Sequence, residues 1–203
     1  MTRVKQDYTK ILTDILGNLA HLNHIQPSEI PHINLFMDQV TSFMEEHLSN
    51  SKRFEDDKIL TKTMINNYAK NKLLPPPEKK RYSKEHMYML IFIYYLKGFL
   101  PLNDIQAILK PISDQFFNNS DGICMEDIYK EVFRLGEENI SDIGRDILTN
   151  FHTAANSFDG YKGEDRDTLQ IFAFICLLSF DIYLKKEVIE QLIDAMEQKK
   201  DPK

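Results

Sequence analysis

Apolar residues recur every three or four positions along nearly the whole chain, the spacing that places side chains on one face of an α-helix. The pattern predicts a helix over about residues 8–25, which Pro27 and Pro31 would end, and a second helix over about 33–48. With only seven Gly and no Trp in 203 residues, helices are favoured over strands. The fold class expected is all-α.

The middle of the chain predicts three further helices. The stretch LTKTMINNYAKNKLL has Thr61 or Thr63 to cap a helix, and PPPEKKRY after it is expected to form a stiff, exposed loop because three prolines cannot donate backbone hydrogen bonds. Ser83 then begins a helix over 84–97 that Gly98 ends. A short helix, LNDIQAILKPI, is expected to end at Pro111.

Residues 112–122 contain the turn sequence NNSDG and give a candidate domain boundary. Helical segments interrupted by Gly136 and Gly144 should follow, and then a last helix over about 167–198. Three parts are therefore expected. These are an N-terminal helix (1–32), a central region (33–111) and a C-terminal helical region (122–203).

Charge is distributed unevenly, although the net charge of −6 by itself argues against a nucleic-acid partner. Between Lys52 and Lys97 there are eleven Lys or Arg against five Asp or Glu, a local charge of +6, so the rest of the chain carries −12. A basic island in an acidic protein is typical of a DNA-contacting module attached to a part that stays off DNA.

Side chains suited to DNA contact lie on the 60–74 helix and on the basic loop. Exposed amides can reach base edges, lysines can reach phosphates, and a cationic loop can lie along the backbone as a wing. Solvated Lys and Asn faces are also common on helices that bind nothing, so composition leaves both interpretations open. The candidate DNA-binding residues are Lys62, Thr63, Asn66, Asn67, Lys70, Lys72, Lys79, Lys80, Arg81 and Tyr82.

The same segment resembles the MerR-family winged helix-turn-helix. Met64 to Tyr68 match the recognition-helix pattern of that family, Leu73, Leu74 and Pro75 follow at the family's distance, and Lys80 and Tyr82 match the wing. Three departures affect the mode of DNA contact: Asn66 replaces a phosphate-binding Arg, Lys72 replaces the Gly that ends the recognition helix, and Lys79 replaces a wing Tyr. Positions that match behind the wing are Leu90, Ile93, Gly98, Phe99, Leu102 and Ile105.

The stretch from Ile33 to about Ile140 also resembles a mostly Gram-positive bacterial family of unknown function that is thought to be MerR-like. Together the two resemblances imply a DNA-binding transcriptional regulator with a winged helix-turn-helix. The alternative is a protein-interaction module that has kept the fold without DNA binding. Such a module would enrich no genomic fragment.

The apolar segment Leu169–Leu184 bears on oligomeric state and on membranes. It is about 16 residues long, short of the roughly 20 that cross a bilayer, and contains Asp181, so a buried or shared helix is expected and no membrane partner. Because little else in the C-terminal part could cover it, a homodimer built through these helices is expected. An unknown effector would bind there or in a pocket lined by Phe172, Phe174 and Phe180.

Other kinds of site find little support. His21 and His24 are three residues apart without a third ligand nearby, and the NNSDG turn lacks the carboxylates of a calcium loop, so no metal and no cofactor are expected. No phosphate loop or nucleophile motif is present, and the expectation is that the chain is not an enzyme. Charged residues interrupt the N-terminal apolar pattern, unlike a signal peptide, and Cys124 and Cys176 are not spaced as a redox pair, so a cytoplasmic location is expected.

Overall fold

Helices make up most of the protein, which confirms the all-α prediction. The computed structural model describes residues 8–19 and 24–198. Besides the helices, the described residues contain one short 3₁₀ turn, η1, and a pair of two-residue strands. In chain order the elements are α1 (Tyr8–Leu19), β1 (Leu35–Phe36), α2 (Met37–Leu48), η1 (Ser49–Ser51), α3 (Lys62–Lys70), β2 (Arg81–Tyr82), α4 (Lys84–Leu96), α5 (Leu102–Phe116), α6 (Met125–Ala155) and α7 (Glu164–Gln198).

The chain divides into two compact units, and the division differs from the three parts expected from the sequence. Unit 1 combines the residues up to His24 with 132–187, so the N-terminal helix belongs with α6 and α7. Unit 2 combines 25–131 with the residues from Val188 onward. The expected boundary at 112–122 lies inside unit 2.

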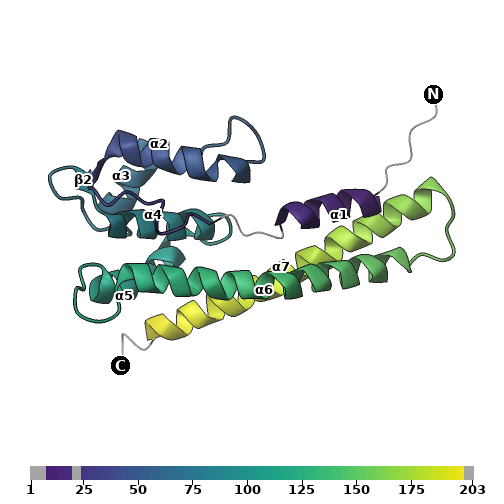
Figure 1. Cartoon of the computed structure of the whole chain (residues 1–203). Coiled ribbons are helices and arrows are strands. Elements are labelled where there is room, and N and C mark those ends of the chain that lie inside the picture. The colour runs from purple at the N-terminus through teal and green to yellow at the C-terminus, as the bar shows by residue number, and fades with distance from the viewer. Residues whose placement is uncertain (1–7, 20–23, 199–203) are drawn as a thin grey trace. The chain divides into compact units, whose positions relative to one another are not determined.

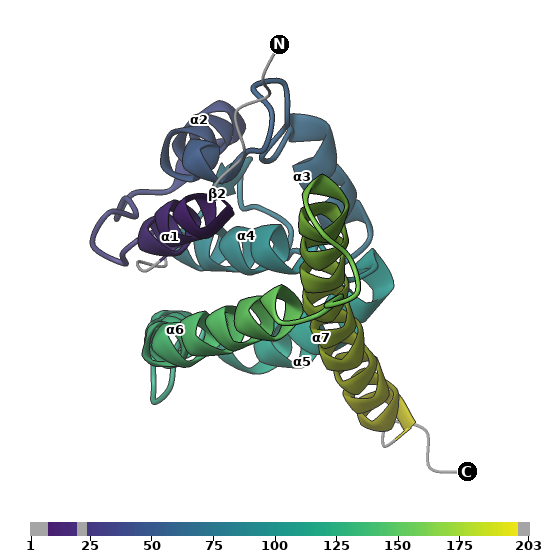
Figure 2. The ribbon, with the colours of Figure 1, turned by 90° about the vertical axis from the view of Figure 1, so that its right-hand side faces the viewer.

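Unit 2 is built around α4, which buries seven of its thirteen side chains and leaves none fully exposed. Met89, Leu90, Ile91 and Ile93 are completely enclosed, each stabilising the fold by about 1.5–3 kcal/mol relative to an exposed side chain. The two strands pair antiparallel, and β2 contacts both α2 and α4. Figures 1 and 2 show α2, α3 and α4 grouped around β2.

The first turns of α6 also belong to this core. Tyr129 is fully buried, and its hydroxyl donates a 2.7 Å hydrogen bond to the carbonyl oxygen of Ile25. Its ring lies 4.7 Å from that of Tyr88 on α4. The start of α6 is therefore fixed by a hydrogen bond to the segment before β1 and by a ring contact with α4.

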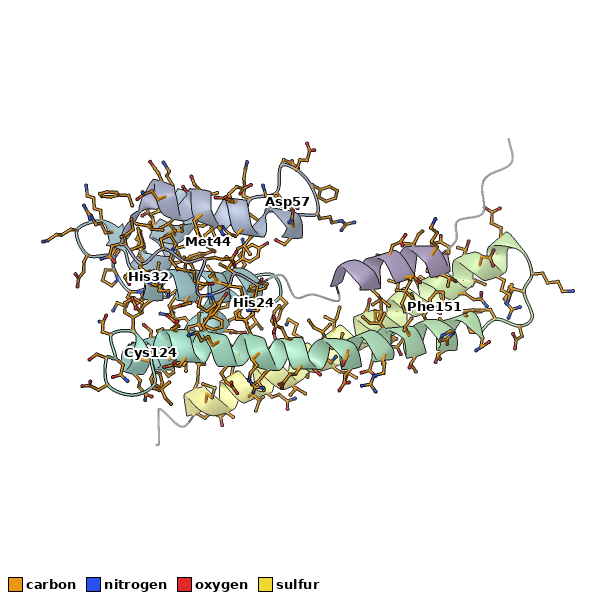
Figure 3. All side chains as sticks on the ribbon, viewed as in Figure 1. His24, His32, Met44, Asp57, Cys124 and Phe151 are labelled. Carbon is orange, nitrogen blue, oxygen red and sulfur yellow. The ribbon has the colours of Figure 1, made fainter. Side chains whose placement is uncertain are left out.

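Unit 1 consists of α1, the part of α6 from Val132 onward and the part of α7 up to Glu187, labelled in Figure 1. Its described core cluster contains the buried side chains of Leu12, Ala154 and Phe174, and the ring of Phe151 meets that of Phe174 edge-on at 5.3 Å (Figure 3). His24 stacks on Phe133 at 4.7 Å, with its Nδ1 3.1 Å from the Glu137 carboxylate. His21 lies outside the described residues.

Two predicted element boundaries were wrong in the N-terminal half of unit 2. Leu35 and Phe36 form a strand, because they pair with Tyr82 and Arg81. The Phe36 N–H donates to Oε1 of Gln39, so a side chain in the first turn of α2 caps that helix. Helix α3 ends at Lys70, so Leu73 and Leu74 are buried in the loop after it.

Two predicted helix breaks are also absent. Helix α5 continues through Pro111 to Phe116, although a proline inside a helix lacks one backbone donor. Helix α6 continues through Gly136 and Gly144, because glycine weakens a helix by only about 1 kcal/mol. Packing of α6 along the apolar face of a long neighbouring helix outweighs a cost of this size.

Within a single copy, the three aromatic side chains expected to line an effector pocket on α7 do not converge. At 100° per residue, Phe172, Phe174 and Phe180 point to three different sides of the helix. Phe174 is buried in the core of unit 1, whereas Phe172 and Phe180 are more than 60% exposed. The three rings therefore do not line one cavity.

Candidate nucleic-acid interface

Helix α3 presents an apolar face to the core of unit 2 and a polar face to solvent. Thr61 caps it, accepting a 3.2 Å hydrogen bond from the Met64 N–H, and Ile65 and Tyr68 are buried beneath it. The residues on the other side are the ones predicted from the sequence to contact DNA, and all of them are exposed. They are Lys62, Thr63, Asn66, Asn67 and Lys70.

The end of α3 holds a lysine in a backbone conformation that usually belongs to glycine. Lys72 has a φ of 58°, in the left-handed region. The Leu73 N–H donates to Tyr68 O at 2.9 Å and the Lys72 N–H to Ala69 O at 3.1 Å, the two bonds of a Schellman cap. The chain therefore leaves the helix sharply, with the exposed Lys72 side chain at the corner.

A tight two-residue turn follows the three prolines. The Arg81 N–H donates to Glu78 O at 2.8 Å, and the central residues Lys79 and Lys80 have φ values of 48° and 64°. Positive φ at both centres defines a type I′ turn, for which Asn-Gly is the usual pair. Left-handed backbone costs a residue with a Cβ roughly 1–2 kcal/mol, so this turn is strained at both lysines.

The turn is joined to the rest of unit 2 through the strand pair. Tyr82 pairs with Leu35 and Arg81 with Phe36, and the Arg81 guanidinium lies 4.8 Å from the centre of the Phe36 ring. A shallow hollow of about 550 Å³ is lined there by Asn34, Phe36, Glu78, Lys79 and Arg81. Sequence reasoning missed Asn34 and Phe36, because only the strand pairing brings them beside the turn.

Tyr82 is the exception among the predicted contact residues. Its side chain is only 3% exposed and meets the His86 ring edge-on at 5.4 Å. The alternation of a strand explains this, since successive side chains point to opposite faces and Arg81 points outward. Tyr82 therefore supports the turn from inside and offers no side-chain surface to DNA.

Most of the exposed lysines and arginines predicted to contact DNA have no acidic partner in the part of the chain that the structure describes. Lys62 is the exception, because it forms an ion pair with Asp38 of α2. Cations without an intramolecular partner keep their full charge for a ligand. Those exposed and without an ion pair among the described residues are Lys70, Lys72, Lys79, Lys80 and Arg81.

His86 lies beneath the proline loop and is buried. Its Nδ1 accepts a 3.0 Å hydrogen bond from the Ser83 N–H, so the neutral ring carries its proton on Nε2. Burial lowers the pKa of His86, while the nearby carbonyl groups of Pro75 and Pro76 oppose the shift. Glu85 and Glu78 oppose it to a smaller extent. The folded protein therefore holds this ring neutral.

We expect acid to loosen the α4 start through His86. The folded pKa lies below the unfolded value of 6.5, so the unfolded chain binds the proton first and stability falls as pH drops below about 6.5. His86→Gln keeps an acceptor for the Ser83 N–H and should flatten that fall between pH 7 and pH 5 in urea unfolding. His152→Gln, exposed on α6, is the control. A variant as acid-sensitive as the parent would contradict the assignment.

A family model described as a domain of unknown function, DUF1836, matches residues 25–132, which is more than half of the chain. The chain belongs to the DUF1836 family. No curated protein and no solved structure matches it. The DUF1836 match covers the whole long segment of unit 2, from the residue after His24 to the first turns of α6, and so contains the whole candidate interface.

Proposed function

We propose that the protein is a DNA-binding transcriptional regulator, acting as a homodimer, whose helix α3 and Lys79–Lys80 turn contact double-stranded DNA. One observation carries the proposal. Of the non-glycine residues with positive φ among those described, three are lysines, and all three lie at this surface. Backbone strain of this kind clusters at functional sites, and these lysines supply positive charge there, which glycine cannot.

The exposed amides and lysines of this surface correspond to the base contacts and the phosphate contacts of DNA recognition. Asn66 and Asn67, exposed on α3, can hydrogen-bond base edges in the major groove, adenine in particular. Lys70 and Lys72 at the end of α3 and the lysines of the turn would hold phosphates, which position a protein without reading sequence. The regulator would act in the cytoplasm, where bacterial DNA is, and could respond to an effector whose site is still to be located.

The MerR resemblance supports this proposal at two points. Lys72 replaces the glycine that ends the recognition helix in that family, and its φ of 58° is a conformation that glycine adopts freely. The β1–β2 pairing fixes the segment after α3 in the manner of a short wing. A winged helix-turn-helix is thus the fold that we propose for unit 2.

The wing assignment predicts a specific salt dependence. Replacing Lys79, Lys80 and Arg81 together by Ala should lower affinity and reduce the slope of log K against log salt, by about 0.9 for each phosphate that the variant no longer neutralises. Lys110→Ala, on α5 and paired with Asp114, should change neither. Selection of genomic fragments by the purified protein supplies the DNA for a shift assay. If no fragment is enriched, or if the triple variant binds as the parent does, the proposal fails.

A further inference from the structure

Phe36 is an exposed aromatic residue beside the Lys79–Lys80 turn. The alternation of side chains along β1 turns Leu35 inward and leaves the Phe36 ring 49% exposed. Phe36 is also the N-cap residue of α2, a position where Ser, Thr, Asp or Asn usually accepts a backbone hydrogen bond, and its side chain makes no such bond. Neither full burial nor side-chain capping of α2 therefore explains an aromatic residue at this position.

The Phe36 ring lies against the side chain of Arg81. The two residues are directly opposite in the β1–β2 pair, and the guanidinium carbon of Arg81 lies 4.8 Å from the ring centre. The Glu78 carboxylate lines the same hollow, but no ion pair joins it to Arg81 within the part of the chain that the structure describes. A ring covers one face of a guanidinium and leaves the N–H groups at its edge available, whereas a carboxylate would occupy them. Arg81 is therefore placed by the ring with its donors still open to a ligand.

An arginine placed in this way suits a phosphate of the DNA backbone. The planar guanidinium donates two parallel hydrogen bonds to phosphate oxygens, and this geometry depends on the orientation of its plane. A long side chain loses rotamer freedom when it binds, and contact with a ring before binding removes part of that cost. Lys79 and Asn34 line the same hollow, so a second cation and an amide lie beside the guanidinium.

We propose that Phe36 is a positioning residue, which orients Arg81 to donate two hydrogen bonds to one backbone phosphate of double-stranded DNA. The inference rests on the proposed function and adds to the interface a residue of β1, outside α3 and the Lys79–Lys80 turn. A phosphate contact does not read sequence, so Phe36 strengthens binding to different DNA sequences alike.

A double-mutant cycle on DNA affinity tests this role, with a genomic fragment selected by the parent protein as the probe. Phe36→Leu should weaken binding by about twofold to tenfold, the cost of ordering one long side chain. Arg81→Gln should weaken binding and also reduce the salt slope by about 0.9. In the Arg81→Gln background, Phe36→Leu should have no further effect, because the side chain that it orients is gone. Losses that multiply in the double variant would mean that Phe36 acts independently of Arg81, and would overturn the proposal.

Two further variants separate positioning from a general loss of folding, which urea unfolding of each variant measures. Phe36→Tyr keeps an aromatic ring and should bind DNA as the parent does. Phe54→Leu is the matched control, because Phe54 is exposed and has the Arg53 guanidinium 5.1 Å from its ring, but follows η1 at the other end of α2. This control should leave DNA affinity unchanged. Equal losses in Phe54→Leu and Phe36→Leu, or a Phe36→Tyr variant as weak as Phe36→Leu, would overturn the proposal.

The same assay distinguishes this inference from the proposed function. A parent protein that selects no genomic fragment would overturn both. A parent that binds DNA as tightly as Phe36→Leu does would overturn the positioning role alone and leave the proposed function in place.

Discussion

The double substitution Lys79→Asn, Lys80→Gly is expected to make the protein more stable and, at the same time, a much weaker DNA binder. Asn-Gly is the pair that a type I′ turn favours, and it would relieve the left-handed backbone strain at both positions. The gain in the free energy of unfolding should be about 1–2 kcal/mol in urea titrations. The salt slope of DNA binding should fall by about 1.8 if each lysine holds one phosphate.

A second variant separates charge from strain. Lys79→Gln, Lys80→Gln removes the same two charges but keeps side chains for which positive φ is unfavourable. This variant should therefore bind DNA more weakly without gaining stability. Weaker binding by both variants, with a stability gain only in the Asn-Gly variant, is the expected pattern. If the Asn-Gly variant is more stable and binds DNA as the parent does, the lysines are not kept for phosphate contact.

The apolar spacing was enough to predict most helices, because periodicity reports directly which side of a helix is buried. Helix α7 was expected over 167–198 and spans Glu164–Gln198, and α4 begins after Ser83 as predicted. Helix α6 was expected to break at Gly136 and Gly144. Local propensity cannot show that packing along a long apolar face outweighs two weak positions.

The strain at the candidate interface could not be predicted from the residues. A type I′ turn is recognised in a sequence by Asn or Gly at its centre, and Lys79 and Lys80 give no such signal. The burial of Tyr82 depends on the two-residue pairing with Leu35, which lies 47 positions earlier in the chain. Charge and amide composition indicated a group of side chains that the structure leaves mostly exposed, and long-range pairing decides which of them face outward.

An ion-pair network joins α4 to the start of α6. The Glu126 carboxylate lies 2.8 Å from Lys84 Nζ and 2.7 Å from Lys130 Nζ, and it faces the buried hydroxyl of Tyr88. Hydrogen bonds from Lys130 and Lys84 lower the pKa of Glu126 to about 2. Lys84 is only 15% exposed, so its charge depends on this carboxylate more than a surface lysine would.

Glu126→Gln is therefore expected to destabilise unit 2 by about 1–2 kcal/mol at pH 7, a figure reduced for the partial exposure of the carboxylate. Because the pKa is lowered on folding, this contribution is fully present above about pH 4.5 and is lost as pH falls toward 2. The difference between parent and variant in urea unfolding should thus be constant from pH 7 to about 5 and shrink below pH 4.5. Glu138→Gln, which breaks an exposed pair with Arg134, should cost no more than about 0.5 kcal/mol. If the variant and the parent had the same free energy of unfolding at every pH, the ion-pair network would contribute nothing to the packing of α4 against α6.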